Sequence, residues 1–230
     1  MTSDLGPASG SAARGALGDA TGGGDGDGAA PTIREAAARV GAYRWAEQRL
    51  FRLTGGWAGA PSVSDSVRVH LFEMSAQHAW HAELWAQRLP VLAGMDPERL
   101  TRPLGRSMGP VLTAVGLGEA DERDWLTGLY RVALPRLLVT YREHLARVAP
   151  VAEAPVARAL ALVVRDEHEQ LLAGEALLQS LLVTAEGVRR AAELQRSLET
   201  LLVGTGAGAG YFSCSGGISA GEVPRRASAP

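Results

Sequence analysis

The chain has 230 residues, a mass of 24.1 kDa, 46% hydrophobic residues and a net charge of −2, which is enough for one well-buried domain. The near-neutral charge gives no electrostatic reason to expect a nucleic acid or an anionic membrane as partner. Every basic side chain is Arg, which excludes a lysine Schiff base and a P-loop lysine, and the single cysteine, Cys214, excludes an internal disulfide and a cysteine zinc cluster.

The two ends of the chain have little to bury. Residues 1–31 are rich in Gly, Ala, Ser and Asp, and residues 204–230 are rich in Gly and Ser, so we expect a disordered leader and a disordered tail. No apolar run approaches the roughly 18–20 residues of a membrane span. The N-terminus also lacks the basic and apolar regions of a secretory signal. A cytoplasmic bacterial protein is therefore the default expectation.

Apolar residues recur with a helical period in the first half of the chain. A first helix begins at Thr32, which stands in capping-box spacing to Glu35, and we expect it to end near Thr54, before two glycines. A second helix spans about 61–89. Residues 90–120 have too many Pro and Gly for one long helix, so they predict a packed crossover with short helical pieces.

The second half predicts three more helices, over about 121–149, 155–183 and 186–203. Pro135 lies inside the first of them and should bend it. Two long helices with a short connection, a long crossover and two more long helices are one way to close a four-helix bundle. We therefore expect an all-α fold, with a four-helix bundle over residues 32–183 and an accessory helix over 184–203.

Polar side chains stand among the residues that should face the core. At about 100° per residue, one narrow stripe of the second helix holds Val67, Leu71, Met74, His78, His81 and Trp85. Glu47 takes a central inward position on the first helix, as Glu167 does on the fourth, and Gln170 follows one turn later. An unpartnered polar group in a core costs a few kcal/mol, so these groups should meet partners.

Other polar residues are assigned to faces in the same way. On the third helix, Tyr141 and His144 join the apolar face and Glu143 falls opposite to it. Asp166 and Glu169 are sequence neighbours of the inward glutamate of the fourth helix. They rotate about 100° and more away from it, and we expect both on a solvated face.

The positions of these groups along the bundle axis can be estimated by counting residues back from the short connections between paired helices. His78 and Glu167 then come out nearly level. Glu47 lies a turn or two to one side, and His81 lies to the other side, near the polar groups of the third helix. One shared site is allowed by this register but not required by it.

The helix order, the crossover and the inward carboxylates over roughly residues 32–183 resemble the ferritin-like superfamily. In that superfamily a carboxylate on the first helix, Glu-x-x-His on the second, Glu on the third and Glu-x-x-His on the fourth bind two metal ions. The corresponding positions here are, in chain order, Glu47, His78 and His81, Tyr141 or His144, and Glu167 and Gln170.

This pattern departs from the family's by losing bridging carboxylates, which argues against a standard oxygen-activating di-iron centre. Two imidazoles and two carboxylates remain, and this set suits a single Fe(II) or Mn(II), with Zn(II) less favoured. The expected metal ligands are Glu47, His78, His81 and Glu167, and the residues that would line the site are Tyr141, His144 and Gln170. The resemblance implies a redox or oxygen-related activity, that of a metal-dependent oxidoreductase or oxygenase.

Other interpretations remain open. His78 and His81 can be core histidines that hydrogen-bond to Glu47 and Glu167, with no metal, in a non-enzymatic binding or scaffold bundle. The same groups can line a metal-free ligand pocket. A DinB-type bundle, with one metal held by histidines on neighbouring helices, fits the His-x-x-His spacing but lacks a matching inward histidine on the fourth helix.

Three single residues have simpler interpretations. Arg44 lies one turn before Glu47 and can pair with it. Tyr141 is expected to be a core residue whose hydroxyl reaches a helix end. Trp80 lies off the histidine stripe and is expected to pack against another helix or a partner subunit, so a homo-oligomer stays open. Nothing in the sequence identifies a small-molecule substrate.

Overall fold

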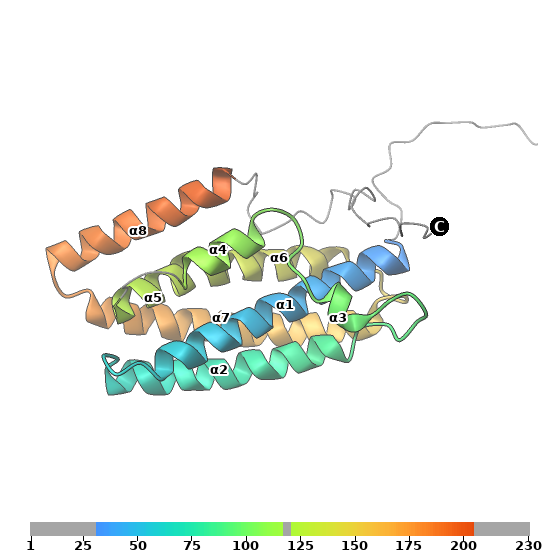
Figure 1. Cartoon of the computed structure of the whole chain (residues 1–230), viewed down its shortest axis with the longest axis horizontal. Helices are drawn as coiled ribbons and strands as arrows, with labels where there is room; N and C mark the ends of the chain where they lie inside the picture. The colour runs from blue at the N-terminus through green and yellow to red at the C-terminus, as the bar shows by residue number, and fades with distance from the viewer. Residues whose placement is uncertain (1–30, 117–120, 205–230) are drawn as a thin grey trace, which may run out of the picture.

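The structure is a computed structural model, and it describes residues 31–116 and 121–204. The predicted leader and tail fall almost entirely on residues outside these ranges. Within them the chain is helical and forms no strand, so the all-α prediction is confirmed for this part (Figure 1). The helical elements are α1 (Ile33–Ala58), α2 (Asp65–Ala86), α3 (Pro97–Leu100), α4 (Met108–Ala114), α5 (Glu122–Gly128), the π-helical turn η1 (Leu129–Ala133), α6 (Leu134–Arg147), α7 (Ala154–Leu181) and α8 (Ala185–Gly204).

Helix α1 begins as predicted and ends later than predicted. The Thr32 backbone N–H donates to Glu35 Oε2 at 2.8 Å, and the Glu35 N–H donates to Thr32 Oγ1 at 3.3 Å, which is the expected capping box. The predicted end near Thr54 is wrong, because α1 continues to Ala58. A Cβ on Gly55 would lie 2.9 Å from Ser75 Oγ of α2. The glycine therefore serves the close packing of α1 on α2 rather than ending the helix.

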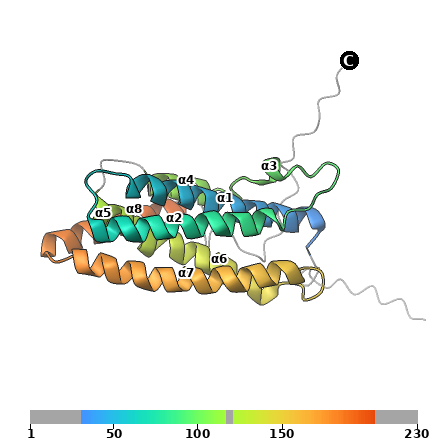
Figure 2. The same ribbon diagram turned by 90° about the horizontal axis from the view of Figure 1, so that it is seen from below.

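The long helices lie side by side along one direction. α1 and α2 run antiparallel and contact each other along their lengths, and α6 packs on α7 (Figures 1 and 2). α2 and α7 also touch, so α1, α2, α6 and α7 surround a shared interior in which Tyr43, Leu71 and Trp85 are fully buried. No helix in the described ranges is both long and apolar enough to span a membrane.

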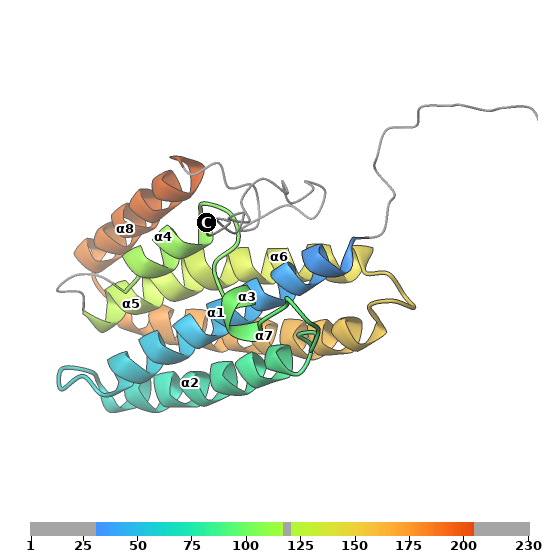
Figure 3. The same cartoon turned by 45° about the vertical axis from the view of Figure 1, so that its right-hand side comes forward.

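The segment between α2 and α5 contains the short helices α3 and α4, as the sequence predicts for its crossover. Both contact α1 (Figure 3). Arg44 of α1 donates to Glu98 Oε1 and to Thr101 Oγ1, each at 2.9 Å. The alternative in which Arg44 pairs with Glu47 is therefore wrong. The long Arg44 side chain extends to the crossover instead of along its own helix.

Residues 122–147 form one continuous helical path with an irregular turn. Asp121 caps it, accepting hydrogen bonds from the backbone N–H groups of Arg123 and Asp124. The π turn η1 ends two residues before Pro135, which has no N–H to donate and lies where the sequence predicts a bend. Helix α8 packs against α5 and η1. Residues 126–134 are consequently buried, except that Arg131 is half-buried.

Candidate metal centre

Four donor side chains from three helices meet in the interior. Glu47 comes from α1, His78 and His81 from α2, and Glu167 from α7, and one ligand atom of each lies within 4.8 Å of all the others. All four residues are buried, at 0–1% exposed. The predicted separation of Glu47 from His81 along the axis is wrong, because His81 Nδ1 lies 3.6 Å from Glu47 Oε2. α1 and α2 are shifted relative to the prediction, so that Glu47 reaches both histidines.

The distances within this quartet match the spacing of ligands around one ion. His78 Nδ1 lies 2.7 Å from Glu47 Oε2 and 3.4 Å from Glu167 Oε1. His81 Nδ1 lies 3.2 Å from Glu167 Oε1 and 3.6 Å from Glu47 Oε2. With metal–ligand bonds of about 2.0–2.1 Å, tetrahedral ligands stand about 3.4 Å apart and adjacent octahedral ligands about 3.0 Å. The quartet can therefore hold a metal ion after small side-chain adjustments.

Two further side chains hold the quartet in place from outside. The Tyr141 hydroxyl donates to Glu47 Oε1 at 2.5 Å, so the prediction that this hydroxyl reaches a helix end is wrong. His81 Nε2 lies 3.4 Å from Asp166 Oδ2, and Arg165 pairs with the other oxygen of Asp166 at 3.1 Å. A second partner on the far nitrogen of a ligating histidine is the usual way in which proteins orient that ring.

The position of Asp166 contradicts its predicted place on a solvated face. The residue is only 7% exposed, whereas Glu169 is exposed as expected. The Asp166 side chain lies about 100° around α7 from the buried stripe. It does not point to solvent, because α2 packs against that side of α7. The single-helix pattern could not show which flank the neighbouring helix would cover.

The quartet also contains polar atoms without a partner. His78 Nε2 and Glu167 Oε2 are buried, and neither has a hydrogen bond within the described residues. An unsatisfied buried polar group costs about 1–3 kcal/mol. A carboxylate that binds a metal through both oxygens satisfies both of them, so the free oxygen of Glu167 fits an ion at this position.

The carboxylates and imidazoles shift one another's pKa. Burial by itself would lower the pKa of His78, but Glu167 and Glu47 outweigh burial and raise the pKa to about 9. Burial also opposes charge on His81, and the same two carboxylates raise its pKa to about 10. Burial would raise the pKa of Glu47, but the hydrogen bonds from both histidines lower the pKa to about 2. Without a metal, both histidines of the quartet therefore favour the charged imidazolium form, beside the ionised form of Glu47.

The residues expected to line the site differ in how close they come to it. Tyr141 touches the quartet directly. His144 contacts the Tyr43 hydroxyl through Nδ1 at 3.0 Å and Glu153 through Nε2 at 3.3 Å, so the rings of Tyr43 and Tyr141 connect it to the quartet. Burial and the nearby Arg39 lower the pKa of His144 to about 4. The sequence analysis expected His81 to lie near both polar groups of the third helix. Tyr141 does reach the quartet, whereas the ring nitrogens of His144 contact Tyr43 and Glu153.

Gln170 lies one turn along α7 from the quartet. Its amide nitrogen donates to Gln77 Oε1, and its own Oε1 is buried and has no partner in the described ranges. On the same side, the Tyr130 hydroxyl contacts His70 Nε2 and Met74 Sδ. The sequence analysis did not find this cluster, because His70 lies at the edge of the buried face of α2 and is only half-buried.

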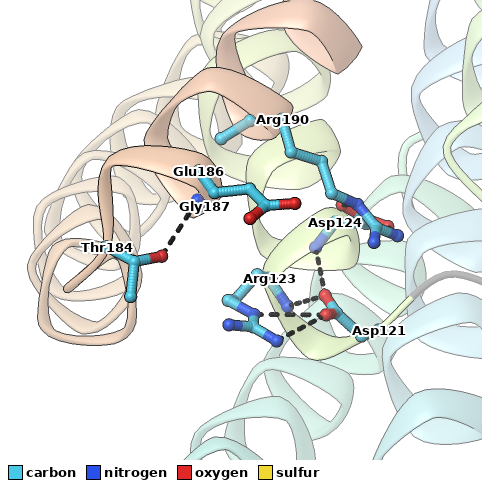
Figure 4. Close-up of a pocket in the computed structure, with 8 residues that line it drawn as sticks. Asp121, Arg123, Asp124, Thr184, Glu186, Gly187 and Arg190 are labelled. Atoms are coloured by element: carbon cyan, nitrogen blue, oxygen red, sulfur yellow. Dashed lines mark hydrogen bonds and ion pairs between the residues drawn. The ribbon is translucent and has the colours of Figure 1, made fainter.

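A surface depression of about 240 Å³ lies apart from the quartet, between the first turns of α5 and α8 (Figure 4). Its charged groups largely satisfy one another: Arg123 pairs with Asp121 at 2.8 Å, and Arg190 pairs with Asp124. We therefore assign the depression to the packing of α8 and not to a binding site.

Comparison with known proteins adds no assignment: no family model, no curated protein and no solved structure matches this chain. The functional argument therefore depends on the residues and their geometry. Two imidazole nitrogens and two carboxylate oxygens are a donor set that first-row divalent metals accept. The quartet is the strongest candidate site in the described part of the chain.

Proposed function

We propose that this chain is a metal-binding helical protein whose centre holds one divalent ion on Glu47, His78, His81 and Glu167. The observation that carries the proposal is the convergence of these four buried donors, from three helices, within 4.8 Å. Two carboxylates balance the charge of a divalent ion, and two neutral imidazoles complete the set. A dry interior would tolerate such a neutral assembly better than any single unpaired charge.

We also propose a ferritin-like architecture. Its four long segments would be α1, α2, the path α5–η1–α6, and α7, with α3 and α4 in the crossover and α8 as the extra helix. The antiparallel α1/α2 pair and the packing of α6 on α7 support this arrangement (Figures 1 and 2). The inward polar groups on three of the four segments support it as well.

The proposed activity is that of a metal-dependent oxidoreductase, with Fe(II) or Mn(II) favoured over Zn(II). Four protein ligands would saturate tetrahedral zinc. On iron or manganese, which bind up to six ligands, they would leave two positions open, or one position where Glu167 binds through both oxygens. A small oxidant or substrate would bind in such open positions. Within the chain, Tyr141 and Asp166 would hold Glu47 and His81 in their binding orientations.

A second candidate function has its own observation. The 2.7 Å contact between His78 and Glu47 and the raised pKa of His78 support a quartet whose charges satisfy one another without a metal. In that case the network fixes the relative positions of α1, α2 and α7 in a non-enzymatic binding or scaffold protein. A network of this kind can often be replaced by apolar side chains without loss of stability.

Metal titration of the chelator-treated full-length protein separates the two candidates. We expect Fe(II), added without oxygen, or Mn(II) to bind at one ion per chain and to raise the melting temperature. An ion at about 100 times its dissociation constant stabilises a fold by about 2.7 kcal/mol. The variant His81→Ala should lose this effect. His168→Ala, which changes an exposed histidine of α7, should keep it.

The opposite result would support the structural network. It would consist of no bound metal, no shift of the melting temperature with Fe(II), Mn(II) or Zn(II), and a His78→Leu, Glu167→Gln double variant at least as stable as the wild type. A large loss of stability in that double variant under metal-free conditions would count against the scaffold candidate.

A further inference from the structure

The outer face of α2 carries a continuous apolar stripe that no other described helix covers. Val69, Phe72, Ala76 and Trp80 follow one another at spacings of three and four residues, so they line one side of the helix. Phe72 is 69% exposed, Val69 58% and Trp80 46%. In Figures 1 and 3, α2 lies along the lower edge of the molecule. We call these four residues the α2 stripe.

The α2 stripe is symmetric in sequence about Ala76. Phe72 and Trp80 each lie four residues from it, or about 6 Å along the helix axis. If two copies of α2 cross antiparallel with Ala76 at the centre, Phe72 of each copy comes level with Trp80 of the other. The small Ala76 side chain would allow the two helices to approach to about 8–10 Å. A two-fold interface requires a surface that complements itself in this way.

Charges beside the stripe fit the same arrangement. Positions at equal distances from Ala76 face each other across the axis, so Glu73 comes level with Ala79 of the second copy and Glu83 with its Val69. No two like charges stand at matching positions along the stripe. The acidic residues of α2 therefore do not oppose this pairing, although they would oppose a parallel one in which each Glu73 meets its own copy.

The apolar area is also of the size that a stable dimer needs. Phe51 of α1, 42% exposed, adjoins the stripe, since Ser75 Oγ of α2 donates to its backbone carbonyl. Aromatic side chains bury about 150–250 Å² each, so these exposed fractions amount to roughly 400 Å² of apolar surface per copy. Two copies would bury on the order of 800 Å², close to the apolar half of a standard interface of about 1,600 Å².

We infer that two copies of this chain form a dimer through the α2 stripe, with a two-fold axis at Ala76. The partner is thus a second copy of the same chain. This inference does not depend on the metal centre, because the stripe faces away from the quartet on the same helix. It places the proposed centre of each copy one helix diameter from the interface.

Sedimentation of the full-length protein tests the dimer. We expect a mass of about twice 24.1 kDa at micromolar concentrations. Ala76→Glu places two like charges at the axis and should give a monomer with unchanged helix content, since Ala76 is exposed. Val188→Glu makes a matched change on α8, on the far side of the molecule, and should remain a dimer (Figure 1). A monomeric wild type, or an Ala76→Glu variant that stays dimeric, would overturn the inference.

Cysteine cross-linking tests the position of the axis. In a Cys214→Ser background, Ala76→Cys should form an interchain disulfide on mild oxidation, because a residue at the axis faces its own copy within the roughly 7 Å that a disulfide needs between Cα atoms. Val69→Cys should not cross-link, because its copies lie on opposite sides of the axis. Cross-linking at Val69 but not at Ala76 would show a different pairing and overturn the proposed geometry.

Discussion

At the scale of single residues, the proposed centre depends on side chains that orient the ligands. Asp166 approaches the Nε2 atom of His81, which leaves Nδ1 to face the quartet, and the Tyr141 hydroxyl holds one oxygen of Glu47. Asp166 in turn is held by Arg165, whose side chain is 63% exposed. The orientation of a buried ligand is thus connected through two residues to the surface of α7.

Asp166→Asn should weaken metal binding without unfolding the protein. The amide keeps the size of the side chain but loses the charge that favours the His81 orientation, and changes of this kind typically cost about 10–100-fold in metal affinity. Competition with a chelating dye would measure the affinity. Glu169→Gln makes the equivalent change at an exposed position of α7 and should have no effect. Equal affinities for the two variants would show that Asp166 does not orient a ligand.

Helical periodicity predicted most of the inward residues, but not their contacts. Glu47 and Glu167 were placed inward because they fall among apolar residues at helical spacing, and both are buried. The convergence of the four groups at one level could not be predicted, since it depends on the relative shift of helices joined by loops of unknown shape. Asp166 was missed because its burial depends on α2 and not on its own helix.

At the scale of elements, the contact between η1 and α7 depends on a glycine, Gly174, which has no side chain. The Tyr130 ring lies against Gly174, and a Cβ there would lie 2.0 Å from the ring carbon Cζ. Glycine thus lets the π turn bring Tyr130 close to the backbone of α7. π turns often occur at functional sites, and here the turn supports the side of the core next to Glu167.

Gly174→Ala should destabilise the protein by about 1–3 kcal/mol, the usual cost of overpacking a filled core. Gly56→Ala is the control, because nothing lies within 4 Å of a Cβ at that position of α1. The control should stabilise α1 by about 0.5–1 kcal/mol, since alanine is the better helix former. Urea unfolding measures both changes. Equal stability of the two variants would show that the Tyr130 ring can move away from a Cβ at residue 174, and would contradict the predicted need for glycine.

The helical elements could be predicted more readily from the sequence than their ends and irregular turns. The capping box at Thr32 and the cap at Asp121 gave correct helix starts because these interactions are local. The end of α1 was predicted too early, since Gly55 is retained by packing against α2. The π turn had only Pro135 as a sequence indication, and its exact form depends on the helices packed around it.

At the scale of the whole molecule, the metal-free protein should lose stability at high pH. The pKa of His78 is about 9 and that of His81 about 10 in the folded state, against 6.5 when unfolded. Their contribution is therefore complete below pH 6.5 and is lost as the pH rises through 9–10. Denaturant unfolding with a chelator present, at pH values from 6.5 to 10, should show a steady fall in the free energy of unfolding.

Two groups lower the stability of the protein as the pH falls, and only one of them belongs to the quartet. The pKa of Glu47, about 2 against 4.5 when unfolded, gives stability that is present above pH 4.5 and lost as the pH falls toward 2. His144, with a pKa near 4, also loses stabilisation as the pH falls from 6.5. The loss of stability at alkaline pH therefore tests the charged state of the quartet more directly, because it comes from His78 and His81. No change in stability between pH 6.5 and 10 would contradict the charged state assigned to the quartet.

Anomalous diffraction from crystals of the full-length protein grown with Mn(II) or Zn(II) tests the metal centre most directly. The account predicts one strong peak per chain in the interior between α1, α2 and α7. The peak should lie about 2.0–2.2 Å from a nitrogen of His78, a nitrogen of His81 and oxygens of Glu47 and Glu167. A fully ordered quartet with no peak among these atoms, in crystals that contain the metal, would contradict it and leave the four residues as a structural network.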